Sequence, residues 1–582
     1  MADVIEVDVL VVGAGPAGAA TSVFLGRAGV RTLMISRFHG TAETPRAHIT
    51  NQRTMEVLRD AGLEQSCMAQ ASPPNHIEHS FWLRSMAGEE LARTWSWGND
   101  PRRRGDYLDA SPCVMNDMPQ TILEPVLVTE ATRLGVQMRF GWELQSFEQD
   151  EQGVTAMVRD RLLNGLITVR AKYMVGADGA RSRVVEQLGI PLEGQHGLAN
   201  VFNVVCDMDL SRHVAHRHGS LYAVIQPNSA YWASVVVFRM VRAWDQWLVA
   251  LIVKQAAGKP EPTLEDFRER IRESIGDDSI DFTIRHTSMW TVNDVVAEYY
   301  SVGRVFCMGD AVHRHPPTNG LGSNTCVQDA FNLAWKLALV IQGKASSRLL
   351  DSYSTERQPV GKQIVARANK SMQQNNIVWD LLGGGTQKEF DSAEHEAVFE
   401  TAEGRETLRQ EVDRMKYEYH AHGVEMARHY ESDAIVADGT APKTPTRDPE
   451  LYYEPDTRPG SYLPHVWLAQ RSPAAPISTL DVAGKGRFML FTGHGGDAWR
   501  NAVCTIAEET GVEIRAVAIG PYLDFEDPYG RWREVVDTAE NGCVLIRPDL
   551  IVGWRSKDLA ADPVAALRAA MAQILGFKEG RA

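Results

Sequence analysis

The pattern of apolar and polar positions predicts an α/β protein with several domains. Apolar runs at 7–12 and 31–35 flank a helical pattern at 19–27, which is the strand–helix–strand arrangement of a parallel sheet. Alternating apolar segments between 200 and 254 instead predict an antiparallel sheet. The last part, 461–582, again alternates strands with amphipathic helices, which indicates a separate small α/β domain.

The loop after the first predicted strand contains the motif G-x-G-x-x-G. Gly13 is expected to form the tight turn, Gly15 to let the backbone approach a pyrophosphate, and Gly18 to let helix and strand pack closely. Pro16 and Ala17 complete the motif, so their backbone is expected at the same site. Because predicted strands flank the motif on both sides, it predicts binding of a dinucleotide.

The acidic residue expected at the end of the second strand is missing. Ser36 stands in its place and is followed by Arg37. A serine hydroxyl can still hydrogen-bond a ribose, although more weakly than a carboxylate does. We therefore expect Ser36 and Arg37 to border the dinucleotide.

A second ligand-binding loop extends from Gly309 to Asn324. It follows a β-like run at 304–308 and precedes a helical pattern that starts at about Thr325. Free N–H groups and the positive end of a helix make such a loop an anion site. Asp310 at its start can hold a sugar hydroxyl but not a bare phosphate. A flavin dinucleotide combines the polyol, the pyrophosphate and the ring that this loop would suit.

The composition is that of a globular enzyme with no nucleic-acid or membrane partner. The chain has 582 residues, enough for three or four domains, and a formal net charge of −15, which disfavours nucleic acid and anionic membranes. No apolar run approaches about 18 residues, and no basic segment precedes an apolar core. These features predict a cytoplasmic protein.

Neither the cysteines nor the histidines predict a metal site. The seven cysteines are scattered and include no C-x-x-C pair, so we expect reduced core thiols. His213, His216 and His218 lie in a charged connection, whereas His313 and His315 lie within the second ligand-binding loop. A zinc site would require convergence of such residues, and we expect none.

Three motifs together resemble a known family. The glycine motif, Asp178-Gly179 and 309–310 follow one another in the order and spacing of the class A FAD-dependent aromatic monooxygenases, of the p-hydroxybenzoate hydroxylase and phenol hydroxylase type. The segment 44–53 also looks like that of phenol hydroxylase-like members, and 543–549 is similar to the usual ending of the family's last domain. The resemblance covers the whole chain.

The resemblance implies an α/β fold with a Rossmann-like FAD-binding domain, an inserted antiparallel-sheet substrate domain, and a C-terminal thioredoxin-like domain that here lacks C-x-x-C. The FAD-binding domain is expected in three pieces. The predicted division is FAD-binding domain 1–75, 113–185 and 291–375, substrate-domain excursion 76–112, substrate-binding sheet 186–290, helical linker 376–460 and thioredoxin-like domain 461–582.

The resemblance also implies roles for individual residues at the cofactor. Arg46 and Gln120 match positions that contact the FAD phosphates or ribityl chain, and Asp310 matches a ligand of a ribityl hydroxyl. Gly322–Asn324 match a loop whose N–H groups reach the isoalloxazine and stabilise negative charge there. The predicted cofactor-binding residues are Gly13, Gly15, Pro16, Ala17, Gly18, Ser36, Arg37, Arg46, Gln120, Leu144, Asp178, Asp310, Pro317, Gly322, Ser323 and Asn324.

Two of these assignments have plain structural alternatives. Gln120 could simply cap the helix that it begins. Asp178 belongs to a motif that in this family lies near the FAD pyrophosphate and the route of the reductant, but it could also be a turn residue ahead of Gly179.

The implied reaction is the hydroxylation of a small aromatic substrate. NAD(P)H reduces the flavin, O₂ adds to it, and the resulting C4a-hydroperoxide transfers an oxygen atom. The leading hypothesis is hydroxylation of a phenol, with chlorophenols among the candidates, ortho to its hydroxyl to give a catechol. The alternatives are another hydroxyaromatic or polyketide substrate, or an FAD oxidase or dehydrogenase that does not hydroxylate. We expect a homodimer or homotetramer.

His48 is the predicted catalytic base, because it stands where phenol hydroxylase-like members carry an aspartate and titrates near neutrality. A structural histidine beside the flavin is an equal alternative. The Pro317 carbonyl is expected to face the reacting edge of the ring system and could orient the phenol instead. Aromatic residues on the sheet could line the pocket or simply form core. The other predicted substrate residues are Tyr222, Trp232, Arg239 and Trp290.

Overall fold

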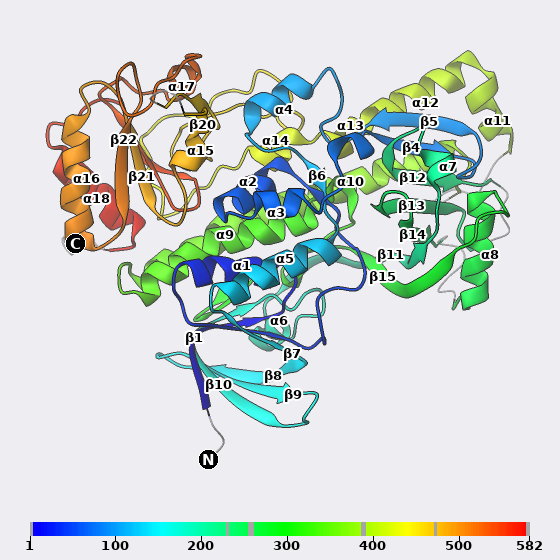
Figure 1. Cartoon of the computed structure of the whole chain (residues 1–582), viewed down its shortest axis with the longest axis horizontal. Coiled ribbons are helices and arrows are strands. Elements are labelled where there is room, and N and C mark those ends of the chain that lie inside the picture. Colours follow the sequence, from blue (N-terminus) through cyan, green and yellow to red (C-terminus); the bar gives the residue numbers. More distant parts are fainter. Residues whose placement is uncertain (1–3, 228–231, 254–260, 386–391, 471–473, 578–582) are drawn as a thin grey trace.

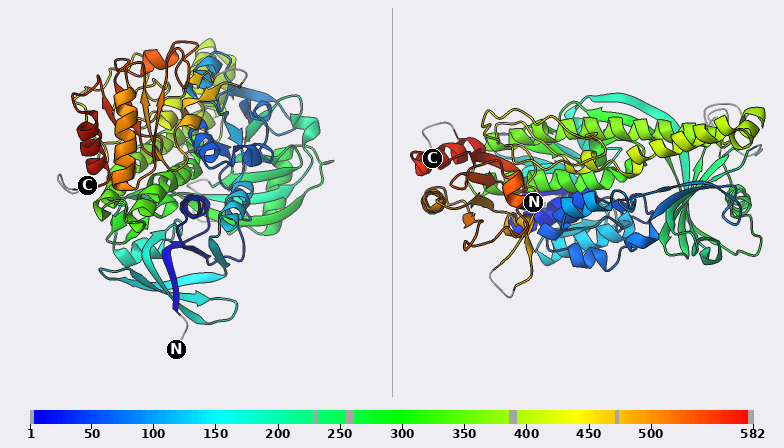
Figure 2. Two further views of the ribbon diagram at one scale, coloured as in Figure 1. Left: turned by 60° about the vertical axis from the view of Figure 1, so that its left-hand side comes forward. Right: turned by 90° about the horizontal axis from the view of Figure 1, so that it is seen from above.

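The computed structural model describes residues 4–227, 232–253, 261–385, 392–470 and 474–577. Figure 1 shows a central unit of helices and a sheet, with an antiparallel sheet on one side and a C-terminal unit on the other. The view from above shows that these two lie at opposite ends of an elongated molecule (Figure 2). None of the described helices is both long and apolar enough to cross a membrane.

The first sheet places the three motif-bearing strands side by side. β1, β10 and β17 are adjacent and parallel, so the loops that follow them leave the sheet at one edge. β2 and β7 continue the parallel order beyond β1. The bounds of these strands are β1 Val4–Val12, β2 Thr32–Ser36, β7 Gln137–Phe140, β10 Leu166–Gly176 and β17 Val305–Cys307.

Local sequence explains why these elements form. The second half of β1 is an almost uninterrupted buried apolar run, as expected for a central parallel strand. Helix α1 (Pro16–Arg27) starts with a proline at its first position and contains small residues that allow close packing. Its neighbours are α5 (Gln120–Arg133) and α9 (Gly322–Ile341), which lie beside it on the same face of the sheet (Figure 1).

Shorter elements complete the central unit. β8 and β9 form an antiparallel extension on β10, and β16 pairs with β17 at the opposite edge. The bounds are β3 Ile49–Thr50, α2 Gln52–Asp60, α3 Glu64–Met68, α4 Arg104–Ala110, β6 Asn116–Asp117, β8 Trp142–Gln149, β9 Val154–Asp160, α6 Arg183–Leu188 and β16 Ser301–Val302.

Most of the second sheet, β11 to β15, is inserted between β10 and β17 in the sequence. Its strand order is β18-β15-β11-β14-β13-β12-β4-β5, so two strands that precede β6 form one edge. Helix α8, which begins with a capping box and ends at a left-handed glycine, covers one face. The bounds are β4 His79–Leu83, β5 Glu90–Trp95, β11 Leu192–Asp207, α7 Ser211–Val214, β12 Gly219–Ile225, β13 Val235–Arg242, β14 Gln246–Ile252, α8 Leu264–Ile275, β15 Thr283–Ala297 and β18 His313–Arg314.

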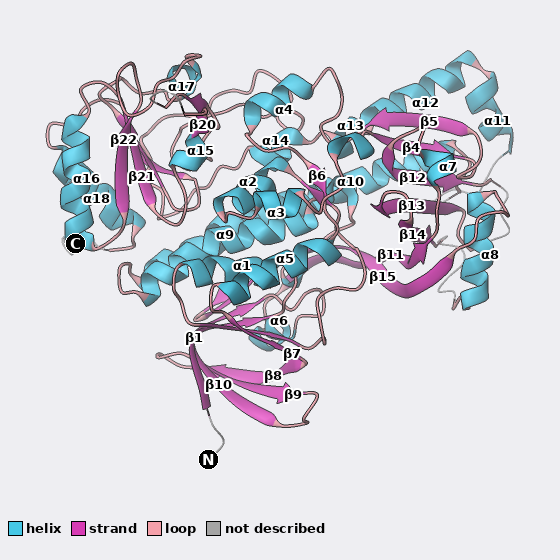
Figure 3. Cartoon of the chain, in the orientation of Figure 1, coloured by secondary structure: helices cyan, strands magenta, loops and turns pink. Residues whose placement is uncertain are grey.

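A long helix and a helical linker connect the central unit with the remaining parts. Helix α10 is the longest of the described helices, and α12 packs beside β5 (Figure 3). The C-terminal sheet has the order β22-β21-β23-β24, with β21–β22 parallel and the other pairs antiparallel. The bounds are α10 Asp351–Leu381, α11 Ser392–Glu400, α12 Ala402–Arg414, α13 Lys416–Tyr419, α14 His422–Met426, β19 Trp467–Leu468, β20 Ile477–Ser478, α15 Thr479–Val482, β21 Phe488–Thr492, α16 Asp497–Thr510, β22 Ile514–Ala518, α17 Arg531–Val535, β23 Cys543–Ile546, β24 Val552–Ser556 and α18 Pro563–Ile574.

A buried group of charges joins the C-terminal unit to the central helices. Glu356 of α10 receives two hydrogen bonds from Arg547, at 2.7 and 2.9 Å, and one from Lys336 of α9 at 2.8 Å. Asp549 also binds Arg547, at 2.5 Å. The Glu356, Arg547 and Lys336 side chains have no exposed surface, and the neighbouring cations hold the pKa of Glu356 well below its usual value. This network fixes the C-terminal unit against α9 and α10.

Removing the central carboxylate should destabilise this contact. Glu356→Ala would leave Arg547 and Lys336 buried without their shared counter-charge, which typically costs about 3–5 kcal/mol. We expect a lower melting temperature and faster proteolysis between the C-terminal unit and the remaining chain. Glu406→Ala, which removes an exposed i,i+3 pair with Arg409, is the matched control and should leave both unchanged. Equal behaviour of the two variants would contradict the role of this network.

Candidate active site

The three motif loops meet at the edge of the first sheet. Gly13 has a φ of +111°, and a Cβ there would lie 2.1 Å from the carbonyl oxygen of Ala177. A Cβ on Gly18 would lie 2.0 Å from the carbonyl oxygen of Gly13. The amides of Ala177 and Met308 donate to the ends of β1 and β10, at 2.8 and 3.0 Å. The glycines therefore allow a contact between loops that any other residue would block.

Gly15 leaves an open space at the start of α1. Within 4 Å of a Cβ at this position lies only a carboxylate oxygen of Glu124, at 3.8 Å. Glu124 accepts a hydrogen bond from Gln120 at 2.5 Å, and the Gln120 amide donates to Ala47 at 2.7 Å. Arg46 is exposed next to this contact. An open glycine, a helix N-terminus and an exposed arginine are what a dinucleotide pyrophosphate requires, so these residues fit FAD.

Glu124 was not predicted as part of this site. Its i,i+4 spacing from Gln120 on α5 is the only signal that the sequence contains. Burial raises the pKa of Glu124, and hydrogen bonds from Gln120 and the Ala42 amide act in the opposite direction. Its carboxylate orients the Gln120 amide beside Gly15.

Asp178 anchors the helix that follows it. Its carboxylate accepts hydrogen bonds from the Ser182 hydroxyl at 2.6 Å and from the amides of Arg183 and Val184 at 2.7 and 3.2 Å. Burial raises the pKa of Asp178 against these bonds. The Arg183 guanidinium in turn donates to the Leu144 carbonyl at 2.9 Å. Asp178 and Leu144 thus lie in one hydrogen-bonded group behind the Gly13 loop, and any direct contact with the cofactor stays a prediction.

Ser36 lies at the end of β2, next to the glycine loop. Its hydroxyl oxygen accepts a hydrogen bond from the Phe38 amide at 3.3 Å, and the side chain is buried. Arg37 is exposed, and its guanidinium lies over the Phe38 ring. The Gly13 amide donates to the neighbouring Ile35 carbonyl at 2.8 Å. The two residues therefore border the predicted cofactor site.

The second ligand-binding loop is fixed to α9 by Asp329. Its carboxylate accepts hydrogen bonds from the Gly309 amide at 3.1 Å and the Arg357 guanidinium at 2.7 Å, and it lies 3.1 Å from His313 Nε2. The His313 ring is thus engaged in the fold. Asp310 is exposed next to this group, and no described residue forms a hydrogen bond or ion pair with its carboxylate. That leaves the Asp310 carboxylate available for a sugar hydroxyl.

Helix α9 starts three residues earlier than the sequence pattern suggested. It begins at Gly322 and not at Thr325, so Gly322, Ser323 and Asn324 form its first turn. The N–H groups of a first turn have no acceptor within the helix, and they point along its axis. The expected donor loop and the helix start are therefore one feature. The reason for the difference is that a glycine–serine–asparagine start carries no apolar signal.

Asn324 connects the two ligand-binding regions. Its side-chain oxygen accepts a hydrogen bond from the Asn51 amide at 3.0 Å, and its nitrogen donates to the carbonyls of Ile49 at 2.8 Å and Gly320 at 2.5 Å. Pro317 is exposed, and its carbonyl accepts the Gly320 N–H at 3.1 Å. The loop with Pro317 is thereby held next to the segment that contains His48.

His48, Asp117 and Arg239 form a buried polar cluster. His48 Nε2 lies 2.9 Å from the Pro45 carbonyl, which assigns the ring proton to this nitrogen. Nδ1 lies 3.3 Å from an oxygen of Asp117 without the alignment of a hydrogen bond, and the other Asp117 oxygen lies 2.8 Å from Arg239. Burial and Arg239 lower the pKa of His48, whereas Asp117 raises it. Nδ1 therefore has no hydrogen-bond partner among the described residues.

The four predicted substrate residues of the sheet do not share one face. In the ladder, Leu221 is opposite Arg239 and Tyr222 is opposite Phe238, so Tyr222 and Arg239 point to different faces. Tyr222 is fully buried, stacks on Phe81 and donates to the Arg217 carbonyl at 2.9 Å.

Trp232 and Trp290 also lie on different faces. Trp232 contacts Phe267 of α8, so it lies on the face that α8 covers. Trp290 is on the Arg239 face according to the strand register. The structure thus places Arg239 and Trp290, but not Tyr222 or Trp232, on the face that Asp117 contacts.

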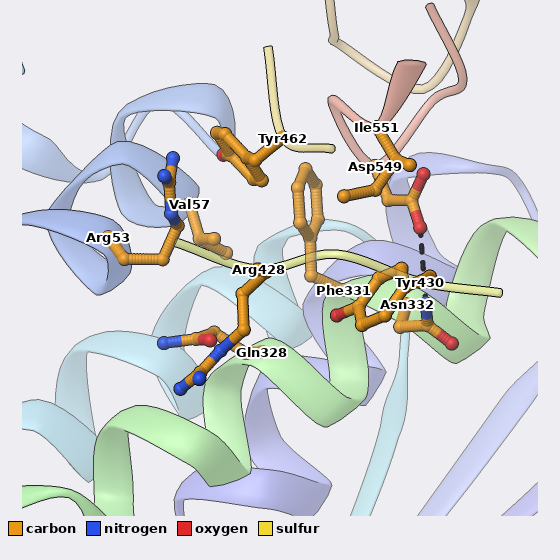
Figure 4. A pocket seen from close by; sticks show the side chains of 10 residues that line it. All are labelled: Arg53, Val57, Gln328, Phe331, Asn332, Arg428, Tyr430, Tyr462, Asp549 and Ile551. Atoms are coloured by element: carbon orange, nitrogen blue, oxygen red, sulfur yellow. Dashed lines mark hydrogen bonds between the residues drawn. The ribbon is translucent and has the colours of Figure 1, made fainter. Parts of the chain in front are cut away.

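A small pocket lies further along α9, between α2 and the C-terminal unit (Figure 4). At its wall, Asn332 donates a hydrogen bond to Asp549 at 3.2 Å. The lining contains none of the predicted cofactor or substrate residues. It is formed by Arg53, Val57, Gln328, Phe331, Asn332, Arg428, Tyr430, Tyr462, Asp549 and Ile551. The pocket belongs to the contact between units.

Comparison with known proteins identifies the family of this chain. Residues 6–368 match the FAD-binding domain family, and residues 456–577 match the C-terminal domain of aromatic-ring hydroxylases. The chain belongs to the FAD-dependent aromatic-ring hydroxylases. FAD is its cofactor, and the predicted α/β fold and monooxygenase class are confirmed.

Individual relatives cover nearly the whole chain. It is 46% identical to 2,4-dichlorophenol 6-monooxygenase of Delftia acidovorans over 99% of both chains. It is 41% identical to phenol 2-monooxygenase of a Pseudomonas species over 97% of this chain and 92% of that protein. The crystal structure of the flavin-dependent monooxygenase PieE, in complex with FAD and substrate, superposes with a TM-score of 0.92 at 44% identity, covering 98% of this chain and 99% of that one.

The contact at Gly13 offers a direct test of the cofactor site. Gly13→Ala would place a methyl group against the Ala177 carbonyl, so we expect purified protein without FAD and no recovery on adding FAD. Gly29→Ala is the matched control, since Gly29 also has a positive φ, +71°, but nothing lies within 4 Å of its Cβ position. It should cost about 1–2 kcal/mol of stability and retain FAD. Normal FAD content in Gly13→Ala would refute this assignment.

Proposed function

We propose that this hydroxylase is an NAD(P)H- and FAD-dependent phenol monooxygenase that converts a phenol, with chlorophenols among its substrates, to a catechol by ortho hydroxylation. The observation that carries this proposal is the buried cluster in which His48 and Asp117 meet Arg239 of β13. The names of the relatives that are 46% and 41% identical support a phenolic substrate.

The polar cluster suits a phenol because it can both remove the phenol proton and compensate the negative charge of the phenolate. His48 Nδ1 would accept the phenol proton, which is typically worth ~10²–10⁴ in rate. Arg239, whose pKa burial lowers, would stabilise the phenolate by its positive charge. Asp117 compensates the arginine when the site is empty. A phenolate is richer in electrons than a phenol and is therefore more easily attacked at the ortho carbon.

The remaining predicted residues would hold the cofactor and protect the reaction. When bound, FAD supplies the transfer of electrons from NAD(P)H to O₂ and of one oxygen atom to the ring. Gly13, Gly15 and Gly18 would hold its pyrophosphate, and Asp310 a ribityl hydroxyl. The first-turn amides of α9 would stabilise negative charge on the ring system, with the Pro317 carbonyl beside the substrate.

Larger aromatic substrates are the second candidate. The chain is 35% identical to a putative polyketide hydroxylase of Streptomyces halstedii. The structure of aklavinone-11 hydroxylase, with FAD and aklavinone, superposes with a TM-score of 0.82 at 29% identity, covering 99% of this chain and 100% of that one. The third alternative, an FAD oxidase or dehydrogenase without hydroxylation, does not agree with the family to which the chain belongs. A homodimer or homotetramer and a cytoplasmic location remain predictions, and sedimentation analysis tests the first.

A substrate screen separates these functions. Phenol and chlorophenols should raise the rate of NAD(P)H oxidation at least several-fold, with little hydrogen peroxide formed. Naphthacene-type polyketides should raise it less. If no phenol stimulates NAD(P)H oxidation and a polyketide does, the second candidate replaces the first. Peroxide formation equal to NAD(P)H oxidation with every aromatic compound would contradict hydroxylation of any of them.

His48→Ala tests the role of the base. We expect turnover to fall by ~10²-fold for weakly acidic phenols and less for acidic chlorophenols, which need less help to ionise. Because the folded-state pKa of His48 lies below its ordinary value of about 6.5, wild-type activity should hold at pH 7 and decline only as the pH falls below that value. The variant should lack this decline. Equal losses for all phenols would point to a structural histidine.

A further inference from the structure

Asn319 has an unusual conformation at the centre of the loop that precedes α9. Its φ is +64°, in the left-handed region that residues other than glycine rarely adopt, and its exposed fraction is 1%. Its side-chain amide donates hydrogen bonds to the carbonyls of Tyr417 at 2.7 Å and Glu418 at 3.0 Å. Both acceptors belong to α13, a short helix of the linker. Asn319 is thus the point where the linker holds the loop.

Helix α10 supports both partners of this contact from behind. The Thr318 hydroxyl donates to the Ala368 carbonyl of α10 at 2.6 Å, which fixes the loop next to Asn319. Asn375 of α10 donates to the Glu418 carboxylate at 2.5 Å, which fixes α13. The loop, α10 and α13 therefore form a closed set of contacts, and such over-determination is what maintains a strained conformation.

The other side of α13 holds the substrate sheet. The Tyr419 carbonyl accepts a hydrogen bond from the Trp97 amide at 3.2 Å, and the two rings meet edge to face at 5.1 Å. His420 Nε2 lies 3.0 Å from the carbonyl of Trp95, the last residue of β5. Trp97 is also left-handed, with a φ of +54°. One short helix thus holds two left-handed residues: Asn319 of the second ligand-binding loop and Trp97, which follows β5.

We propose that Asn319 is a positioning residue. Through its two hydrogen bonds to α13, its side-chain amide sets the distance between the second ligand-binding loop and the sheet that contains Arg239. The proposal rests on the proposed function. Coupled turnover converts the phenol, O₂, NAD(P)H and H⁺ to catechol, NAD(P)⁺ and water. Without correct placement of the substrate, O₂, NAD(P)H and H⁺ yield NAD(P)⁺ and hydrogen peroxide. Loss of the Asn319 contacts therefore shifts consumed reductant from catechol to peroxide.

Asn319→Gly separates the amide from the backbone strain. Glycine adopts the left-handed conformation freely but offers no side-chain donor. We expect the peroxide share of consumed NAD(P)H to rise several-fold and FAD to bind about tenfold more weakly to the apoprotein, the change that two lost hydrogen bonds can produce. Asn319→Asp, which has the same shape but presents a carboxylate to two carbonyls, should behave alike.

Asn369→Ala is the matched control. Asn369 also lies on α10, but its side chain donates within the helix, to the Val365 carbonyl at 2.9 Å. It should retain wild-type FAD affinity and peroxide share. If Asn319→Gly does not fold, Asn375→Ala carries the test, since it loosens α13 without altering the loop, and it should change both readouts in the same direction.

Two results would overturn the proposal. One is an Asn319→Gly protein with the peroxide share and FAD affinity of the wild type. The other is a lower melting temperature of the apoprotein with an unchanged peroxide share, which would make Asn319 a stabilising residue only. If no aromatic compound stimulates NAD(P)H oxidation, the proposed function fails, but the FAD titration still decides whether Asn319 positions the loop.

Discussion

The contact between Gly13 and the Ala177 carbonyl is the constraint on which the cofactor site depends. It requires β1 and β10 to be neighbours, because only adjacent parallel strands bring the loops that follow them so close together. A Cβ on Gly13 would lie 2.1 Å from the Ala177 carbonyl oxygen. The same edge receives Gly309 from β17, packed against Ala17 of α1. The predicted cofactor residues of these three loops take their positions from this meeting.

Helix α9 connects these loops with the rest of the molecule. Its first turn contains Asn324, which joins the His48 segment to the flavin loop, and its later turns contain Asp329 and Lys336, which bind Arg357 and Glu356 of α10. Buried charges of this kind are costly to separate. The helix whose first-turn amides are predicted to face the cofactor is therefore also part of the buried network that holds the C-terminal unit.

Local patterns in the sequence predicted the motif loops, because glycines at fixed spacing determine turns without distant partners. The cluster around His48 was predicted only in part. Asp117 connects His48 with Arg239 across 69 and 122 residues, and no local signal marks such a partner. Tyr222 was predicted near the substrate, but alternation in a strand gives two faces without showing which one meets the flavin. Asn319 likewise donates a hydrogen bond to α13 at Tyr417, which lies 98 residues further along the chain.

Isotope labelling shows directly whether this protein hydroxylates a phenol with one atom of O₂. The FAD-loaded enzyme is incubated with NAD(P)H and a phenol under ¹⁸O₂ in ordinary water, and the mass of the product is measured by mass spectrometry. We expect a catechol in which one of the two hydroxyl oxygens is ¹⁸O, formed in proportion to NAD(P)H consumed. A catechol without ¹⁸O, or NAD(P)H consumption that yields labelled peroxide and no catechol, would contradict it.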